Sequence, residues 1–334
     1  MSKIAHQVRT GSLTCLTALW LASCSTVPLA DSPIVPTIAY HQHLVSPTTA
    51  ALLKGPVIDG ASLLRMLDEA GISQGVVLSM AYTFADERKN VPNPDAHVAA
   101  ENNWTADQVS RANGRLVGFC GVNPLRQAAV AELKRCSQLP GMIGLKLHFG
   151  NSGVDLRNPA HLASIERIFA ASDGMRFPIV VHMRSRSTSP YGEEYGRLFL
   201  KRLLPAAPHV VVQVAHLAGN GGYADDADAV MGVFASAMAQ RDPRTRNLYF
   251  DVTAAVVPDT TPAEANRIAR RIREVGVRRI LFGSDLPLGD NLAAKQSWEV
   301  FRTKVPLTSA EFRQIAANIA PYMRHRKGGS ASHP

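Results

Sequence analysis

The sequence contains few aromatic residues and few acidic ones, and its mean hydropathy is close to zero. Phe, Trp and Tyr make up 6% of the 334 residues, and no arginine-rich stretch is interleaved with them. Without such stacking platforms, nucleic-acid binding has little support. A mean hydropathy of -0.03 also argues against a polytopic membrane protein.

The scarcity of acids gives the chain a net charge of +9, from 36 Lys and Arg against 27 Asp and Glu. The excess is local: two bases precede residue 10, six arginines lie between 267 and 279, and three bases lie in the tail 324–334. We interpret the arginine run as a solvated helix face and the tail as a basic disordered segment. The charge therefore does not indicate a nucleic-acid partner.

Apolar residues are abundant by comparison. They make up 46% of the chain, against 19% charged residues, so a large core can form and low-complexity disorder is excluded for most of the length. The length matches one α/β barrel or two average domains.

The N-terminus has the pattern of a secretory signal. Residues 1–12 contain two bases and no acid, and the apolar stretch Leu13–Ala22 is too short to span a hydrocarbon core of about 30 Å comfortably. It ends in Leu21-Ala22-Ser23-Cys24, which resembles a bacterial lipobox. The resemblance implies cleavage after Ser23, diacylation of Cys24, and anchoring to the bacterial cell envelope facing the periplasm. A soluble secreted protein, or an anchored one with a coincidental cysteine, is the alternative.

We therefore expect a signal peptide over 1–23 and a lipidated tether over 24–36, in which three prolines occur. Removal of the signal lowers the net charge from +9 to +7. Two cysteines then remain as thiols, Cys120 and Cys136. An oxidising compartment would allow them to pair. Because Cys120 is expected within a strand and Cys136 at the end of the next helix, we instead expect two buried thiols.

From Thr37 onward, short β-branched runs alternate with amphipathic patterns. Eight strands are expected, at 37–41, 75–80, 116–121, 143–148, 178–182, 210–216, 248–252 and 279–285. Helices are expected between them, among them 62–70, 128–137, 161–171 and 263–275, and capping boxes begin two helices at Thr261 and Thr308. Eight alternating units predict an α/β fold with a parallel sheet, a closed (β/α)₈ TIM barrel over 37–323. A doubly wound sheet is the alternative, but it would usually carry a Gly-rich loop after its first strand.

Histidines gather at the expected strand ends. Of the 11 in the chain, five are placed there: His41, His43, His148, His182 and His216. The C-terminal strand ends of a barrel converge on its active site. His41 and His43 are two residues apart on one strand, so both imidazoles should face the interior and could chelate one cation. With His182 and Asp285 they form a mixed nitrogen and oxygen ligand set of the kind that zinc favours, with a position open for water.

Seven short motifs follow one another in a specific order: His41-Gln42-His43-Leu44, Leu67-Asp68-Glu69-Ala70-Gly71-Ile72, Gly118-Phe119-Cys120-Gly121-Val122-Asn123-Pro124, Gly144-Leu145-Lys146-Leu147-His148, Val180-Val181-His182, Ala215-His216-Leu217 and Phe282-Gly283-Ser284-Asp285-Leu286-Pro287. By these motifs the chain resembles the amidohydrolase superfamily, specifically its amidohydrolase-related branch of metal-dependent hydrolases and aminocarboxymuconate-semialdehyde-type decarboxylases. The resemblance implies one divalent metal ion, Zn²⁺, held by His41, His43, His182 and Asp285. It also implies that His216 stands beside the metal as a catalytic acid/base or oxyanion stabiliser.

One position departs from the family. An acid usually stands two residues before the first histidine, and this chain has Ala39 there. Any support that the acid gives to metal binding is therefore missing or supplied from elsewhere. For Asp251, at the end of the seventh expected strand, only its position suggests a role.

Further polar residues lie near the expected ligands. Lys146 and His148 share strand parity and should face the interior, whereas Leu145 and Leu147 should face the helices. Lys146 could be carboxylated and bridge two metals, contact a substrate carboxylate, or form a buried ion pair. We favour one metal, because the branch is typically mononuclear. Arg184, with Arg186, could clamp a substrate carboxylate, although a solvated loop explains both equally well.

The favoured function is hydrolysis of a small amide, lactone or ester by a metal-activated water. Asp285 would accept the proton of the water, and His216 with Lys146 or His148 would stabilise the oxyanion. The alternative is a non-oxidative decarboxylase of a small aromatic or muconic-type acid, in which His216 donates a proton to carbon. A third interpretation is a lipid-anchored binding module on a degenerate barrel, against which the complete ligand set counts. The sequence does not specify the substrate or the oligomeric state.

Overall fold

Eight parallel strands form a ring in the protein, whose computed structural model describes residues 33–186, 190–286 and 291–324. The predicted signal peptide with Cys24, almost all of the tether 24–36 and the tail beyond Arg324 lie outside the described residues. No helix in the described ranges is long and apolar enough to cross a membrane.

The strands occur in the ring in chain order, and each pairs in parallel with the next. They are β1 (Ile38–Gln42), β2 (Gln74–Leu78), β3 (Leu116–Gly121), β4 (Met142–His148), β5 (Ile179–His182), β6 (Val212–Val214), β7 (Leu248–Asp251) and β8 (Ile280–Leu281). Backbone bonds then join β1 to the segment that follows β8: Tyr40 N donates to Phe282 O at 2.7 Å, and Asp285 N donates to His41 O at 3.0 Å. The predicted (β/α)₈ TIM barrel is confirmed.

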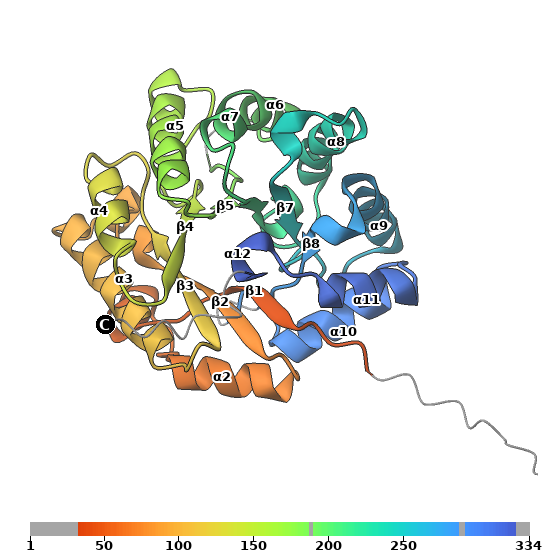
Figure 1. Cartoon of the computed structure of the whole chain (residues 1–334), viewed down its shortest axis with the longest axis horizontal. Coiled ribbons are helices and arrows are strands. Elements are labelled where there is room, and N and C mark those ends of the chain that lie inside the picture. The colour runs from red at the N-terminus through yellow and green to blue at the C-terminus, as the bar shows by residue number, and fades with distance from the viewer. Residues whose placement is uncertain (1–32, 187–189, 287–290, 325–334) are drawn as a thin grey trace, which may run out of the picture. The chain divides into compact units, whose positions relative to one another are not determined.

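Helices lie around the ring of strands, as Figure 1 shows. They are α1 (Pro47–Leu53), α2 (Gly60–Glu69), α3 (Pro94–Ser110), α4 (Ala129–Cys136), α5 (Pro159–Gly174), α6 (Glu193–Leu198), α7 (Leu204–Ala206), α8 (Asp225–Ala239), α9 (Pro262–Val275), α10 (Ala294–Lys304), α11 (Ser309–Ala317) and α12 (Pro321–Arg324). The two capping boxes are present at the starts of α9 and α11, where Thr261 and Thr308 each accept a bond from the backbone of the glutamate three residues on. Local sequence thus determines where these two helices begin.

Two strands, β6 and β8, are much shorter than predicted. β6 ends at Val214 because His216, Leu217 and Ala218 have φ angles of 57°, 47° and 63°. This left-handed backbone cannot continue an extended strand. β8 ends at Leu281, and Asp285, which the sequence placed on that strand, has a φ of 60°. Both turns contain a predicted site residue, His216 or Asp285. Left-handed backbone at such residues persists only when the surrounding structure holds it in place.

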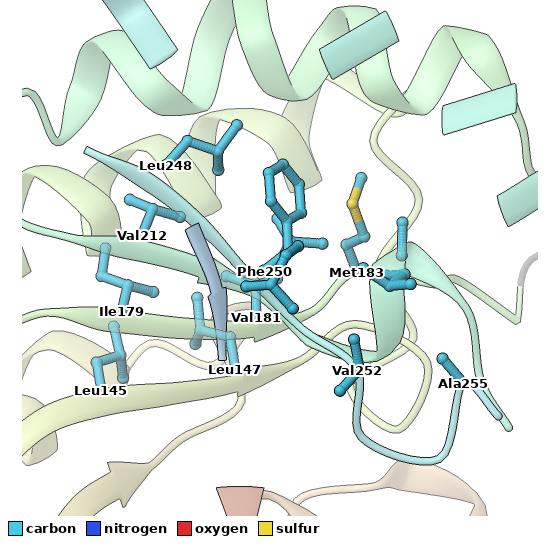
Figure 2. Close-up of a cluster of buried hydrophobic side chains, with 14 of the residues drawn as sticks. Leu145, Leu147, Ile179, Val181, Met183, Val212, Leu248, Phe250, Val252 and Ala255 are labelled. Atoms are coloured by element: carbon cyan, nitrogen blue, oxygen red, sulfur yellow. The ribbon is translucent and has the colours of Figure 1, made fainter. Parts of the chain in front are cut away.

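The strands separate two apolar layers. Leu145, Leu147, Val181 and Phe250 belong to the outer layer between strands and helices, part of which Figure 2 shows. This confirms the predicted outward direction of the two leucines. The inner layer fills the barrel and includes Ile38, Tyr40, Val76, Val117 and Phe119, together with Ala320 and Met323 from the C-terminal segment.

Helix α12 covers the end of the barrel at which the strands begin. The ring of Tyr322 packs edge-on against the rings of Tyr40 and Phe119, with centroids 6.0 Å and 5.5 Å away. Tyr40 Oη in turn donates to Asn318 O and accepts from Ala320 N. In Figure 1 this helix lies across the middle of the ring.

The expectation of two buried thiols is wrong, because Cys120 and Cys136 form a disulfide between β3 and α4. Cys120 lies on the outward side of β3, in the layer under the helices, and the Cα atoms of the two cysteines are 6.1 Å apart. Sequence position alone did not show that the end of α4 packs directly over the middle of the preceding strand.

Reduction of this disulfide is expected to lower the free energy of unfolding by about 3 kcal/mol. The segment between the two cysteines, whose sequence separation is 16, is then no longer closed into a loop in the unfolded chain. Urea unfolding of the protein with and without dithiothreitol measures the difference. If both cysteines react with iodoacetamide in urea without reductant, the disulfide is absent and the prediction fails.

Candidate functional site

His41 and His43 reach the barrel interior from β1 with the help of a bulge. The pairing of β1 with β2 shifts between Ala39 and Gln42, so three residues of β1 span two of β2. Ala39 consequently packs in the outer apolar layer, whereas His41 and His43 line a cavity inside the barrel. An acid at position 39 would thus point away from the site on this backbone. Both histidines are buried, at 0% and 1% exposure.

The Nδ1 atoms of these two histidines are already occupied. His41 Nδ1 is 3.1 Å from Asp251 Oδ2, and His43 Nδ1 is 2.6 Å from Leu78 O. A carboxylate and a carbonyl oxygen only accept hydrogen bonds, so each ring must carry its hydrogen on Nδ1. Nε2 of each ring is thereby available as a lone-pair ligand.

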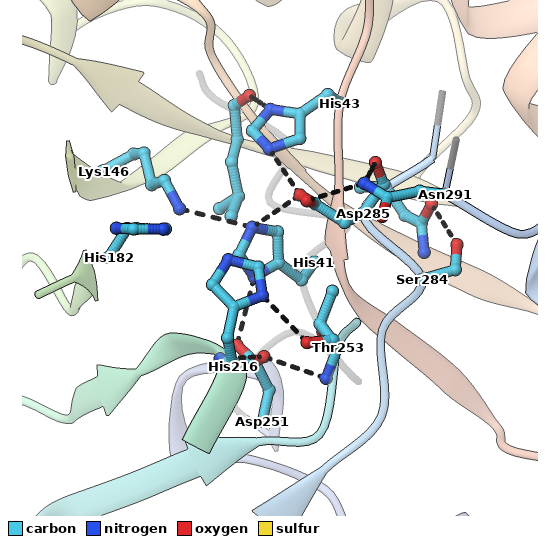
Figure 3. A network of polar contacts seen from close by, with 12 residues as sticks. His41, His43, Lys146, His182, His216, Asp251, Thr253, Ser284, Asp285 and Asn291 are labelled. Carbon is cyan, nitrogen blue, oxygen red and sulfur yellow. Dashed lines mark hydrogen bonds and ion pairs between the residues drawn. The ribbon is translucent and has the colours of Figure 1, made fainter. Parts of the chain in front are cut away.

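Asp285 completes a close group with them. Its Oδ1 lies 3.1 Å from Nε2 of both His41 and His43, and its Oδ2 accepts a bond from Asn291 Nδ2 at 2.9 Å, as Figure 3 shows. Ligand atoms about 2.0–2.2 Å from a tetrahedral zinc ion are themselves roughly 3.3 Å apart. The spacing of these three donor atoms therefore fits a single metal ion.

The fourth predicted ligand, His182 on β5, lies in the same cavity but outside this close group. Its Nε2 is 2.7 Å from Asn220 Oδ1, and its Nδ1 is buried without a hydrogen-bond partner. A buried nitrogen that bonds to nothing is costly unless something else binds it. The open Nδ1 is thus a second observation that fits a metal or substrate in the cavity. Its ring stacks on that of His148 at 3.9 Å.

A second group contains His41, His216 and Asp251, whose donor atoms also lie within 4.8 Å of one another. His216 Nδ1 is 2.8 Å from Thr253 O, which likewise places its hydrogen on Nδ1 and leaves a lone pair on Nε2. The rings of His216 and His41 are 4.7 Å apart. His216 therefore stands directly beside the close group, where the sequence placed it.

Burial keeps most of these rings neutral. It lowers the pKa of His216 to about 4 and lowers the pKa of His43 and of His182 below the usual value. Burial and Lys146 also oppose protonation of His41, but the carboxylates of Asp251 and Asp285 outweigh them and raise its pKa. Neutral imidazole is the form that binds metals.

Two charged groups share the interior with the rings. Burial lowers the pKa of Lys146 to about 8 against the attraction of Asp285 and Asp251, and its Nζ is 3.3 Å from His41 Nε2. Burial tends to raise the pKa of Asp285, but the charge of His41 and the close contacts with His41 and His43 hold it well below the usual value. Asp285 is thus a carboxylate, and Lys146 a cation, at neutral pH.

The cavity has a volume of about 380 Å³ and is lined by His41, His43, Tyr82, Lys146, His148, His182, Arg186, His216, Asn220, Gly221, Ala254, Asp285 and Asn291. Lys146 and His148 therefore face the interior, as their parity predicts. Arg184 does not line the cavity, because both of its terminal nitrogens bond to Asp226. Arg186 does line it, together with a neighbouring cavity of about 480 Å³, and it forms no ion pair with any residue in the described ranges.

Sequence reasoning missed three polar residues that hold the site together and assigned no role to a fourth. Asp251 was noted only for its position, and Gln213, Asn220 and Asn291 were not singled out. Gln213 did carry a signal, because it is a polar residue within the apolar run Val210–Val214. Asn220 and Asn291 lie in loops, where no periodicity marks them.

Comparisons with known proteins agree with this fold. A family model described as amidohydrolase matches residues 38–318. A 5-carboxyvanillate decarboxylase from Sphingomonas paucimobilis has a similar structure, with a TM-score of 0.59 and 14% identity over 87% of this chain and 99% of that chain. A search of curated proteins finds no significant match.

Two further structures differ from each other in activity. One is described as a probable 2-pyrone-4,6-dicarboxylic acid hydrolase from Acinetobacter baumannii (TM-score 0.53, 16% identity, 84% of this chain and 96% of that chain). The other is a dihydroxybenzoic acid decarboxylase from Polaromonas with bound manganese (TM-score 0.55, 17% identity, 84% and 94%). At these identities the likeness shows the shared barrel fold.

Proposed function

Because the chain belongs to the amidohydrolase family, we propose that it is a metal-dependent hydrolase of a small amide, lactone or ester. One divalent ion, Zn²⁺, would be held by His41, His43, His182 and Asp285. The observation that carries the proposal is the convergence of two Nε2 lone pairs and one carboxylate oxygen at 3.1 Å. Both rings are held for this purpose by bonds at Nδ1.

A bound divalent ion would polarise the substrate carbonyl and lower the pKa of a water molecule from about 15.7 toward roughly 7. Asp285 is the base that takes the proton of this water, since it is a carboxylate inside the cavity and Asn291 orients its second oxygen. Lys146 is a buried cation close to His41, so its ammonium group can donate to the oxyanion.

In this mechanism His216 accepts a hydrogen bond at Nε2, and the proton that Asp285 takes from the water passes to the leaving group. The Nδ1 hydrogen of His216 is committed to Thr253 O, and its low pKa leaves Nε2 unprotonated at neutral pH. This favours an orienting role over the oxyanion-stabilising role that the sequence also allowed. It also favours hydrolysis over decarboxylation, because protonation of carbon would require a proton on Nε2.

Decarboxylation is the second candidate, and one observation favours it. Lys146 and Arg186 place two cations in the cavity. The described residues that line it include one acid, Asp285. Such a cavity suits a substrate that carries a carboxylate, which a decarboxylase always requires and a hydrolase of amides, lactones or esters does not.

Metal analysis combined with a substrate panel tests the proposal. We expect about one Zn²⁺ per chain, and release of an acid from lactones, esters or amides without CO₂. Less than a tenth of a metal per chain after mild purification, with no response to added Zn²⁺, Mn²⁺ or Co²⁺, would contradict it. Release of CO₂ from aromatic or muconic acids, without a hydrolytic product, would establish the decarboxylase instead.

Replacing Arg186 by methionine is expected to raise KM about 10-fold or more for substrates with a second carboxylate, and to change kcat much less. The guanidinium lies at the edge of the cavity, so it contributes to binding rather than to the reacting bond. The matched control is Arg184→Met, whose side chain is paired with Asp226 outside the cavity and should leave KM unchanged. Equal effects of the two substitutions would refute a role for Arg186 in binding.

We also propose that the protein is a lipoprotein anchored through Cys24 and facing the periplasm. The lipobox supports this, and so does the Cys120–Cys136 disulfide, because disulfides persist in oxidising compartments. The Cys24→Ser variant should move from the membrane fraction to the soluble periplasmic fraction. Wild-type protein recovered in the soluble fraction without an acyl mass shift would disprove the anchor.

A further inference from the structure

A row of buried polar side chains connects helix α12 to His41 through the barrel. Tyr322 Oη donates to Gln213 Oε1 at 2.8 Å, and Gln213 Nε2 donates to Asp251 Oδ2 at 2.7 Å. The same Oδ2 lies 3.1 Å from His41 Nδ1, a contact drawn in Figure 3. Gln213, Asp251 and His41 are all 0% exposed. Burying polar groups inside a barrel of apolar side chains destabilises the fold unless they form hydrogen bonds. Three polar side chains in this position therefore indicate a role other than packing.

The bonds of the row converge on Asp251: Tyr322 donates to Gln213, Gln213 donates to Asp251, and His41 donates to the same carboxylate from the other side. Because a carboxylate only accepts, Asp251 fixes the NH₂ end of the Gln213 amide toward itself, and the other end then presents its oxygen to the hydroxyl of Tyr322. Asp251 acts as an acceptor at both oxygens, because its Oδ1 accepts from the backbone nitrogens of His216 and Thr253 and its Oδ2 accepts from Gln213. It can only accept, so His41 must carry its hydrogen on Nδ1. The row therefore determines the tautomer of His41, and with it the lone pair on Nε2.

Asp251 also has no oxygen left for a metal. Its Oδ1 accepts from the backbone nitrogens of His216 at 2.9 Å and Thr253 at 3.2 Å, and its Oδ2 is shared by Gln213 and His41. Although it belongs to a group with metal-binding potential, its four donors make it an anchor for the ring of His41 and for the left-handed turn at His216.

We propose that Asp251, Gln213 and Tyr322 are positioning residues that hold His41 ready for the metal, with α12 as the distant end of the row. This inference rests on the proposed metal-dependent function. Asp251 thereby supplies from β7 the support that Ala39 cannot give from β1, since Ala39 faces the outer layer.

The first test compares two tyrosines of the same end of the barrel. Tyr322→Phe removes the hydroxyl that holds Oε1 of Gln213, whereas Tyr40→Phe removes a buried hydroxyl that holds the same C-terminal segment but forms its hydrogen bonds outside the row. We expect Tyr322→Phe to weaken Zn²⁺ binding about 3-fold, measured by chelator competition, and to alter the visible spectrum of the Co²⁺ form. Tyr40→Phe should lower the melting temperature and leave the Zn²⁺ affinity unchanged. Equal affinities for the two variants would overturn the role of Tyr322.

The second test reverses the direction of the two hydrogen bonds that join Asp251 to Gln213 and to His41. Asp251→Asn places an NH₂ group against the donors of Gln213 and His41, so we expect metal affinity to fall 10- to 100-fold. In the double variant Asp251→Asn/Gln213→Glu, the new carboxylate accepts from both Tyr322 and the new amide. The fold should regain its melting temperature, but His41 must then accept at Nδ1 and carry its hydrogen on Nε2. Metal affinity should therefore stay low. Recovery of affinity together with stability would show that the row is only structural and would overturn the inference.

Nitrogen NMR of the metal-free protein separates this inference from the proposed function. The ¹⁵N shifts of His41 should report hydrogen on Nδ1 in the wild type and loss of that hydrogen in the double variant. If the wild type binds no metal but the shifts behave in this way, the proposed function fails and the positioning row stands. If the wild type binds metal and the shifts of His41 do not change, the positioning row fails and the proposed function stands.

Discussion

Replacing Asp285 by asparagine is expected to lower kcat/KM at least 1,000-fold while the protein remains folded. Asp285 Oδ1 is the carboxylate oxygen 3.1 Å from both His41 and His43, and an amide of the same shape can neither bind a metal as strongly nor take a proton from water. Steady-state kinetics, metal content and the melting temperature together measure the effect.

The matched control is Asp226→Asn, which removes a carboxylate that bonds to Arg184 outside the cavity. It should retain most of the activity. An Asp285→Asn protein that keeps more than a tenth of wild-type kcat/KM would show that the reaction does not depend on this carboxylate, and the proposed mechanism would be wrong.

Replacing Gly283 by alanine is expected to destabilise the fold by about 3 kcal/mol and to abolish metal binding. A Cβ at position 283 would lie 2.6 Å from His41 Cβ and 2.9 Å from His41 N, and it would also overlap the hydroxyl of Thr253. Since two of the three close atoms belong to the backbone or Cβ of His41, the strand itself would have to move. Such a movement separates His41 from Asp285, whose backbone nitrogen bonds to His41 O at 3.0 Å.

Thermal unfolding and Zn²⁺ titration measure both consequences. Gly174→Ala serves as the control, because a Cβ there meets no atom within 4 Å. It should leave stability and metal binding essentially unchanged. If Gly283→Ala melts and binds Zn²⁺ like the wild type, the close approach of β1 and the segment after β8 is not what brings the ligands together.

The eight strands and the barrel could be predicted from the sequence because each strand is a short β-branched run followed by an amphipathic stretch. The ends of β6 and β8 could not, because the left-handed backbone at His216 and Asp285 is adopted by residues that are neither glycine nor asparagine. The disulfide was likewise missed, since pairing depends on how α4 lies over β3. These features arise from contacts between segments rather than from the local pattern.

Some residues of the candidate site could likewise be predicted from the sequence, whereas others could be identified only in the folded structure. His41, His43, His148, His182, His216 and Asp285 could be chosen from the sequence, because strand ends in a barrel converge on one face whatever the loops do. Arg184 and Arg186 could not be told apart, because one meets Asp226 and the other a cavity only once the chain is folded.

By itself, the sequence determined the barrel, its order of strands and the chemical types of side chain at the strand ends, because those follow from local periodicity and from the geometry that any such barrel imposes. Only the tertiary structure decided which nitrogen of each histidine is free. That choice depends on partners far away in the chain: Leu78 for His43, Thr253 for His216, and Asp251 with Gln213 and Tyr322 for His41. A hydrogen bond fixes a tautomer only where folding places an acceptor at the right atom, and no local pattern records that position.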